Sequence, residues 1–224
     1  MKIFAGALLA ALISVPAFAQ KDADARLQAA TGDLNEMMNA SDKGIPQDLL
    51  NKATCVVVVP NVKAGGFIVG GKYGKGFFTC RKTGGVGWSA PGSLRITGGK
   101  FGLLIGANET DVIMLVMNRN GMQHLLSNKF QLGGEAAVAG GPVGRSASGM
   151  TDIQMRAEIL SYSRSRGAFA GLDLEGAAVT EDDDANAELY GRKISNHEIM
   201  DSKMAVPASA RPFINTLDRL SSRK

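Results

Sequence analysis

The chain has few of the side chains that most often carry catalysis or bind metal ions. Its 224 residues include two histidines, two cysteines and one tryptophan. His124 and His197 belong to no motif that places a base beside a nucleophile or supplies a pair of metal ligands. The sequence therefore predicts no metal site and no cofactor.

Motifs of hydrolases and nucleotide-binding proteins are also missing. The nearest approach to a Gly-x-Ser-x-Gly nucleophile elbow is Gly-Trp-Ser-Ala-Pro at residues 87–91, where Pro91 replaces the second glycine. Residues 65–76 are rich in glycine but lack the Gly-x-Gly-x-x-Gly pattern that opens a helix after a strand in dinucleotide-binding proteins. We therefore predict that the protein is not an enzyme.

Charge of one sign is not concentrated anywhere in the chain. There are 25 lysines and arginines against 21 aspartates and glutamates, and the net charge is +4. Nonspecific nucleic-acid binding usually requires a clustered cationic field, whereas here bases and acids are interspersed. We predict no nucleic-acid partner.

The N-terminus has the three parts of a secretory signal peptide. Lys2 precedes an apolar run over residues 3–15, and Ala17-Phe18-Ala19 stands before Gln20. The run is shorter than the roughly 20 residues that a membrane-spanning helix needs, and no cysteine follows the expected cleavage point. We predict that residues 1–19 are removed by cleavage between Ala19 and Gln20, which makes the protein periplasmic or otherwise extracytoplasmic.

The two cysteines have two possible fates. Cys55 and Cys80 are separated by 24 residues and would meet an oxidising environment after export, where a disulfide can form. Alternatively, both are buried free thiols on strands that point them apart. The sequence alone leaves both readings open.

Hydrophobic periodicity predicts helices at both ends of the mature chain. Apolar residues recur every three to four positions over residues 22–40 and again over 208–220. Shorter helices are predicted after Pro46 and over residues 119–127 and 184–190. Residues 20–224 are expected to form a single domain with an N-terminal helical segment.

The middle of the chain predicts a curved sheet. Cys55 to Val59 is a wholly apolar, largely β-branched run, typical of a central strand covered on both faces. Residues 65–105 suggest short antiparallel strands with turns at 84–85 and 98–99, and glycines inside the strands require bulges or bending. Further strands are predicted over residues 111–118, 130–138 and 153–162, and residues 168–180 are predicted to pair with the last of these as a hairpin. The predicted fold is α+β, a strongly curved, glycine-rich, mainly antiparallel sheet approaching a barrel and flanked by N- and C-terminal helices.

Several ordered segments resemble the SYLF domain family. The main signature is SYSRSRGAFAGLDLEG at residues 161–176, followed by DDDAN at 182–186 and YG at 190–191. Residues 111–118, 125–133 and 139–145 are similar to preceding SYLF segments in the expected order, so the resemblance covers roughly residues 30–220. It implies lipid binding, with phosphoinositide and actin binding in eukaryotic members and an envelope role in bacterial ones.

Two cationic groups are candidates for binding lipid head groups. Tyr162, Arg164 and Arg166 alternate on one predicted strand, where guanidinium groups could bind phosphate. The alternative is that the arginines pair internally with the acidic run at residues 182–184. A second group contains Lys72, Lys75 and Arg81, close to aromatic residues, although it could equally be a solvated hairpin with inward aromatics.

The predicted N-terminal helix departs from the pattern of eukaryotic SYLF proteins. These are thought to bind phosphoinositides through a basic helix, whereas here residues 22–43 carry more acids than bases. Only general lipid binding is therefore carried over: a non-enzymatic protein of the bacterial cell envelope that binds phospholipid, a membrane surface or a related amphiphile. The alternative is a structural or interaction protein of the periplasm that docks an envelope protein partner.

Overall fold

A nine-stranded sheet forms the centre of the computed structural model, which describes residues 17–40, 44–66, 69–82, 84, 86–101, 106–144, 150–165, 168–169, 174–201 and 204–221. The strand order is β5-β9-β3-β2-β1-β4-β7-β6, with β8 also paired to β7. All the described pairs are antiparallel except β6 with β7. The strands are β1 (Cys55–Gly66), β2 (Val69–Cys80), β3 (Gly92–Phe101), β4 (Gly106–Val116), β5 (Lys129–Gln131), β6 (Val138–Gly140), β7 (Ile159–Ser165), β8 (Ala168–Phe169) and β9 (Ala178–Glu181).

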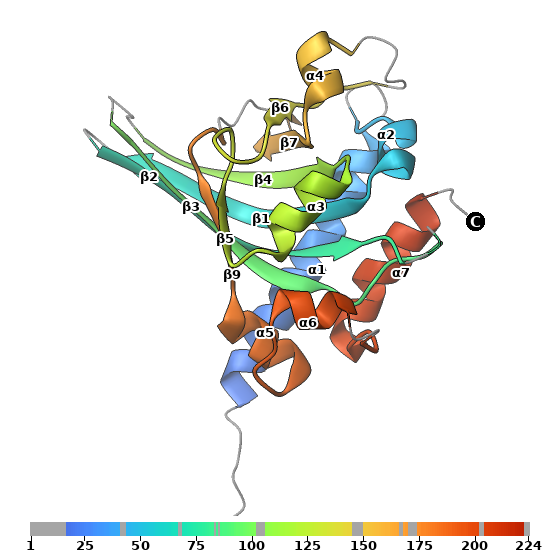
Figure 1. Cartoon of the computed structure of the whole chain (residues 1–224). Coiled ribbons are helices and arrows are strands. Elements are labelled where there is room, and N and C mark those ends of the chain that lie inside the picture. The colour runs from blue at the N-terminus through green and yellow to red at the C-terminus, as the bar shows by residue number, and fades with distance from the viewer. Residues whose placement is uncertain are drawn as a thin grey trace, which may run out of the picture.

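Helices cover both faces of this sheet (Figure 1). In chain order they are α1 (Ala17–Asn39), α2 (Gln47–Lys52), α3 (Arg119–Leu126), α4 (Asp152–Arg156), α5 (Asp183–Tyr190), α6 (Asn196–Asp201), the 3-10 turn η1 (Ala208–Ala210) and α7 (Arg211–Leu220). Figure 1 shows α1 behind the sheet and α3 in front of it. The curled antiparallel sheet with its N- and C-terminal helices confirms the predicted fold class.

Strand β1 lies in the middle of the sheet and is buried on both faces, as its apolar run predicts. Val56 and Val58 belong to the apolar cluster that packs under α1, α2 and α7. Val57 and Val59 belong to the opposite cluster, which includes side chains from α3 and β5. Because side chains alternate along a strand, four consecutive valines can serve two cores only when both faces are covered.

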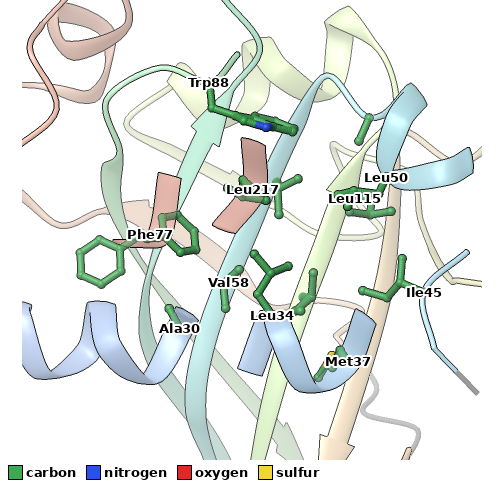
Figure 2. Close-up of a cluster of buried hydrophobic side chains, with 14 of the residues drawn as sticks. Ala30, Leu34, Met37, Ile45, Leu50, Val58, Phe77, Trp88, Leu115 and Leu217 are labelled. Carbon is green, nitrogen blue, oxygen red and sulfur yellow. The ribbon is translucent and has the colours of Figure 1, made fainter. Parts of the chain in front are cut away.

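The predicted N-terminal helix is also confirmed. Its apolar stripe places Leu27, Ala30, Leu34 and Met37 in the buried cluster. Figure 2 shows Leu34 and Met37 on the side of α1 that faces the sheet, in the same cluster as Val58. The stripe is therefore part of the core, because its residues are fully covered by the sheet.

A bulge in β1 explains the glycines inside β2. Between Val58 and Lys63, β1 advances five residues while β2 advances four, from Phe77 to Tyr73. Asn61 in the bulge has a left-handed backbone, with φ of 49°. A Cβ atom added at Gly76 would lie 2.2 Å from the carbonyl oxygen of Val58, so only glycine fits there.

One turn and one strand predicted from the sequence are wrong. Gly98 and Gly99 lie inside β3, paired with Lys72 and Gly71, instead of forming a turn. The predicted strand over residues 153–162 is a helix and a strand, because Thr151 forms a capping box with Gln154 and starts α4. Helix α6 has no counterpart among the predicted elements.

Pairing around the signature also differs from the prediction. Residues 130–138 contain a turn between the end of β5 and the start of β6. In the described part of the segment 168–180, β8 pairs with β7, while β9 pairs with β3 and β5. The segment therefore joins two distant parts of the sheet.

Cys55 and Cys80 are direct partners in the β1–β2 ladder. Their Sγ atoms lie 2.07 Å apart, at the distance of a disulfide bond. The paired strands bring the two side chains together on one face, in contrast to the alternative in which the strands point them apart.

Candidate functional site

An open cleft lies where β1, β2 and β4 continue beyond the bulge; we call it the tip cleft. Its volume is about 760 Å³. It is lined by residues Asn61, Lys63, Ala64, Gly65, Gly71, Lys72, Tyr73, Asn108, Glu109, Asp111 and Ser165. Asn61 of the bulge donates its backbone N–H to Asp111 Oδ1 at 2.9 Å, so the bulge also fixes one wall of the cleft.

The strand register determines which side chains share a face at the tip cleft. Lys63 is opposite Tyr73 on β2 and opposite Glu109 on β4, and Asp111 follows Glu109 by two residues. Residues directly opposite one another, or two apart on one strand, point to the same face of a sheet. Lys63, Tyr73, Glu109 and Asp111 therefore form one surface, of which the Tyr73 side chain is 46% exposed.

Acidic side chains from α1 adjoin this surface. Asp111 is paired across the sheet with Arg164 of β7, and Arg164 Nη1 forms an ion pair with Glu36 Oε2 of α1. Burial, with repulsion from Asp111 and Glu36, raises the pKa of Asp33 to about 7, although Arg164 acts in the opposite direction. One oxygen of Asp33 is buried without a hydrogen-bond partner in the described structure. Three carboxylates thus surround one arginine at this end of the helix.

The predicted lipid-binding residues of β7 do not meet at one exposed surface. Tyr162 is buried in the core under α1, and burial raises the pKa of its hydroxyl. Its ring packs against Gly141, where a Cβ atom would lie 2.1 Å from Tyr162 Cζ. Arg164 is held by Glu36, and Arg166 lies outside the described residues.

The second predicted cationic group is also dispersed. Lys72 is opposite Ala64 and Gly98, which places its side chain on the other face from Tyr73. Lys75 Nζ lies 2.8 Å from Asp182 Oδ2. Arg81 donates to the carbonyl of Leu50 at 3.2 Å, and its guanidinium stacks 4.0 Å from the ring centroid of Trp88. A head-group role for these residues stays a prediction, and the structure assigns Lys75 and Arg81 to internal contacts.

The acidic run of the signature anchors the C-terminal segment to the sheet. Asp182 is fully buried, caps α5 through the backbone N–H of Ala185, and pairs with Lys75 and with Arg95 at 3.7 Å. Asn186 accepts a hydrogen bond from the backbone of Ser93 at 2.8 Å. Asp182 is thus the N-cap of α5, and the cations beside it come from β2 and β3 instead of the signature arginines.

No group of three or more histidine, cysteine or acidic side chains in the described ranges could hold a metal ion. Among the described helices, none is both long enough and apolar enough to cross a membrane.

Sequence reasoning missed the tip cleft itself, because Lys63 and Glu109 belong to no recognisable motif. The nearest signal was the cluster of cations beside Tyr73.

The fold is a curled sheet with an open cleft of mixed charge at one end. The family profile described as "Ysc84: Las17-binding protein actin regulator" matches residues 97–220. The chain belongs to this Ysc84 family, whose domain is the SYLF domain. The family consists of binding and regulatory domains.

Curated relatives extend the match over most of the chain. Protein YSC84 of Saccharomyces cerevisiae is 30% identical over 187 residues, which is 82% of this chain and 39% of the relative. SH3 domain-containing YSC84-like protein 1 of Xenopus laevis is 33% identical over 83% of this chain and 55% of the relative. LAS seventeen-binding protein 3 of Saccharomyces cerevisiae is 30% identical, over 82% of this chain and 40% of the relative. The chain thus spans about two fifths to just over half of these proteins.

Proposed function

We propose that this protein is a non-enzymatic lipid-binding protein of the bacterial cell envelope, which binds phospholipid or a related amphiphile. The observation that carries the proposal is the tip cleft, an open cavity of about 760 Å³ beside a half-exposed tyrosine. Ligand sites combine concave shape with a few convergent polar groups, and tyrosine is favoured where a ring meets a boundary between water and lipid. SYLF membership supports the same function.

Export is part of the proposal. Cleavage after Ala19 would remove the signal peptide and leave the buried stripe of α1 from Ala23 to Met37. The disulfide-distance pair of Cys55 and Cys80 is compatible with an oxidising compartment. N-terminal sequencing of the protein recovered from a cell fraction tests both the cleavage point and the location.

Vesicle co-sedimentation of the exported protein tests lipid binding. Tyr73→Ser should reduce the bound fraction, because it removes the ring at the mouth of the cleft. Val86→Ser is the matched control: Val86 is 57% exposed but lies between β2 and β3, outside the cleft lining. No binding of the wild type to any vesicle, or equal losses in both variants, would contradict the proposal.

Docking of a protein partner is a second candidate function. One relative is named LAS seventeen-binding protein 3. In this chain, Ile153 and Met155 of α4 are 74% and 62% exposed, so both apolar side chains are accessible to a partner. A saturable complex with one envelope protein, formed without lipid and lost in the double serine variant of these residues, would favour this function.

A further inference from the structure

We propose that the tip cleft binds the ammonium group of a zwitterionic head group, phosphocholine or phosphoethanolamine. This inference rests on the proposed lipid-binding function and names its ligand class. It differs from the expectation based on sequence, in which arginines and lysines bind an anionic head group.

The charge of the cleft surface favours a cation. On the face that carries Tyr73, the cleft lining has one base, Lys63, against two acids, Glu109 and Asp111; the other charged lining residue, Lys72, has its side chain on the opposite face. Arg164, directly opposite Asp111, is paired with Glu36 and so does not offset the charge of Asp111, while Asp33, whose pKa is raised to about 7, adds a partial negative charge. The local potential is therefore negative, and it attracts an ammonium group but opposes a purely anionic one.

Tyr73 supplies the second element of an ammonium site. It stands opposite Lys63, on the face of β2 that is shared with Glu109 and Asp111. A quaternary or primary ammonium group placed over an aromatic ring is stabilised by the ring quadrupole. An aromatic face beside two carboxylates can thus hold the positive end of the head group.

Lys63 can contact the phosphate of the same head group. Its Nζ lies 3.8 Å from Glu109 Oε1, and both side chains are largely exposed. An exposed pair of this kind contributes little stability, so it can separate at small cost when a ligand enters. Phosphate would then take the place of Glu109 at Lys63, while Glu109 turns to the ammonium group.

Two of the other predicted cations have internal partners in the described structure. Lys75 pairs with the buried Asp182, and Arg81 donates to backbone carbonyls next to Trp88. A head group of high negative charge would have to compete with these internal contacts. A zwitterionic head group requires only the side chains of the cleft.

The test compares vesicles of phosphatidylcholine, of phosphatidylethanolamine and of phosphatidylglycerol, with the exported protein. We expect binding to one or both zwitterionic lipids to exceed binding to phosphatidylglycerol at least about fivefold. Stronger binding to phosphatidylglycerol would overturn the inference but retain the lipid-binding function, whereas no binding to any vesicle would overturn both. Competition by soluble phosphocholine or phosphoethanolamine shows whether the head group alone is sufficient.

Variants separate recognition from folding. Tyr73→Phe keeps the ring and should keep the preference, whereas Tyr73→Leu should weaken zwitterionic binding about threefold to tenfold.

Asp111→Asn keeps an acceptor for the Asn61 N–H but loses the charge, so the preference should move toward anionic vesicles. Glu109→Gln, at an exposed position, serves as the second variant if Asp111→Asn unfolds. Asp48→Asn, on α2, is the charge-matched control and should leave binding unchanged. An unchanged preference in both folded acid variants would refute the inference, as would binding of a lysine-rich peptide in place of lipid.

Discussion

Replacement of Asp33 by asparagine should change how the stability of the protein depends on pH. Burial and the neighbouring carboxylates of Asp111 and Glu36 raise the pKa of Asp33 from its ordinary 3.8 to about 7. The folded protein therefore binds the Asp33 proton more tightly than the unfolded chain does. Between about pH 4 and pH 7 the free energy of unfolding should fall as pH rises, because folding then opposes ionisation of this group.

The magnitude follows from the same pKa values. A rise of about three pKa units, at about 1.4 kcal/mol for each, sets a ceiling of about 4 kcal/mol. Because Asp33 is only half-buried, solvent screening reduces this figure, and we expect about 1–2 kcal/mol. Asp33→Asn has no charge at any of these pH values, so its stability relative to wild type should rise by that amount between pH 4 and pH 8.

Urea denaturation at closely spaced pH values measures this difference directly. Subtracting the two curves at each pH cancels the contributions of titrating groups that do not interact with Asp33, including Glu181 and Glu188, whose pKa values are also raised by burial. Gln28→Ala, an exposed change on the same helix that removes no titrating group, should give a difference that does not vary with pH. If the difference for Asp33→Asn does not vary with pH, the folded protein does not disfavour the ionised form of Asp33, and the reasoning is refuted.

Three other changes test the framework of the fold. Gly76→Ala should lower the free energy of unfolding by about 2–3 kcal/mol in urea denaturation, because the added Cβ atom would overlap backbone atoms of β1. Gly99→Ala is the control and should be tolerated, because the nearest atom to its Cβ would be the carbonyl oxygen of Gly70 at 3.8 Å. Arg81→Ala should cost about 2–4 kcal/mol through lost hydrogen bonds and ring stacking, while vesicle binding by the folded fraction stays unchanged. Asp182→Ala should lower the free energy of unfolding by about 3–5 kcal/mol, because it leaves Lys75 without its buried partner. A thermal midpoint within about 2 °C of wild type, which corresponds to about 0.5 kcal/mol, would contradict this prediction.

Much of the fold could be predicted because it is encoded in local patterns. The stripe of α1 and the apolar run of β1 have the periods of a helix and of a strand covered on both faces, and the structure contains both. Glycines inside the apparent strands predicted bulging, which occurs at Asn61. Predictions from local patterns were wrong where helix capping or strand pairing determined the structure instead. The apolar alternation of residues 153–162 is interrupted by the capping box of Thr151, and the glycine pair at 98–99 is accommodated inside a strand.

The candidate site could be predicted only in part. The sequence located a cationic segment around Tyr73 but not the partners of its charges. Arg164 meets Glu36 across 128 residues of sequence, and Lys75 meets Asp182 across the sheet. No local motif contains this information, because an ion pair depends on which distant segments the fold brings together.

The sequence by itself determined the periodic elements, the family and the scarcity of catalytic side chains, since these properties depend on residue type and spacing. Tertiary structure alone decided which charges are neutralised internally and which border an open cleft. It did so through strand register: a shift of one residue moves a side chain to the other face of a sheet. Lys72 and Tyr73 are neighbours in the chain, yet their side chains lie on opposite faces, and only Tyr73 shares its face with the acids of the tip cleft.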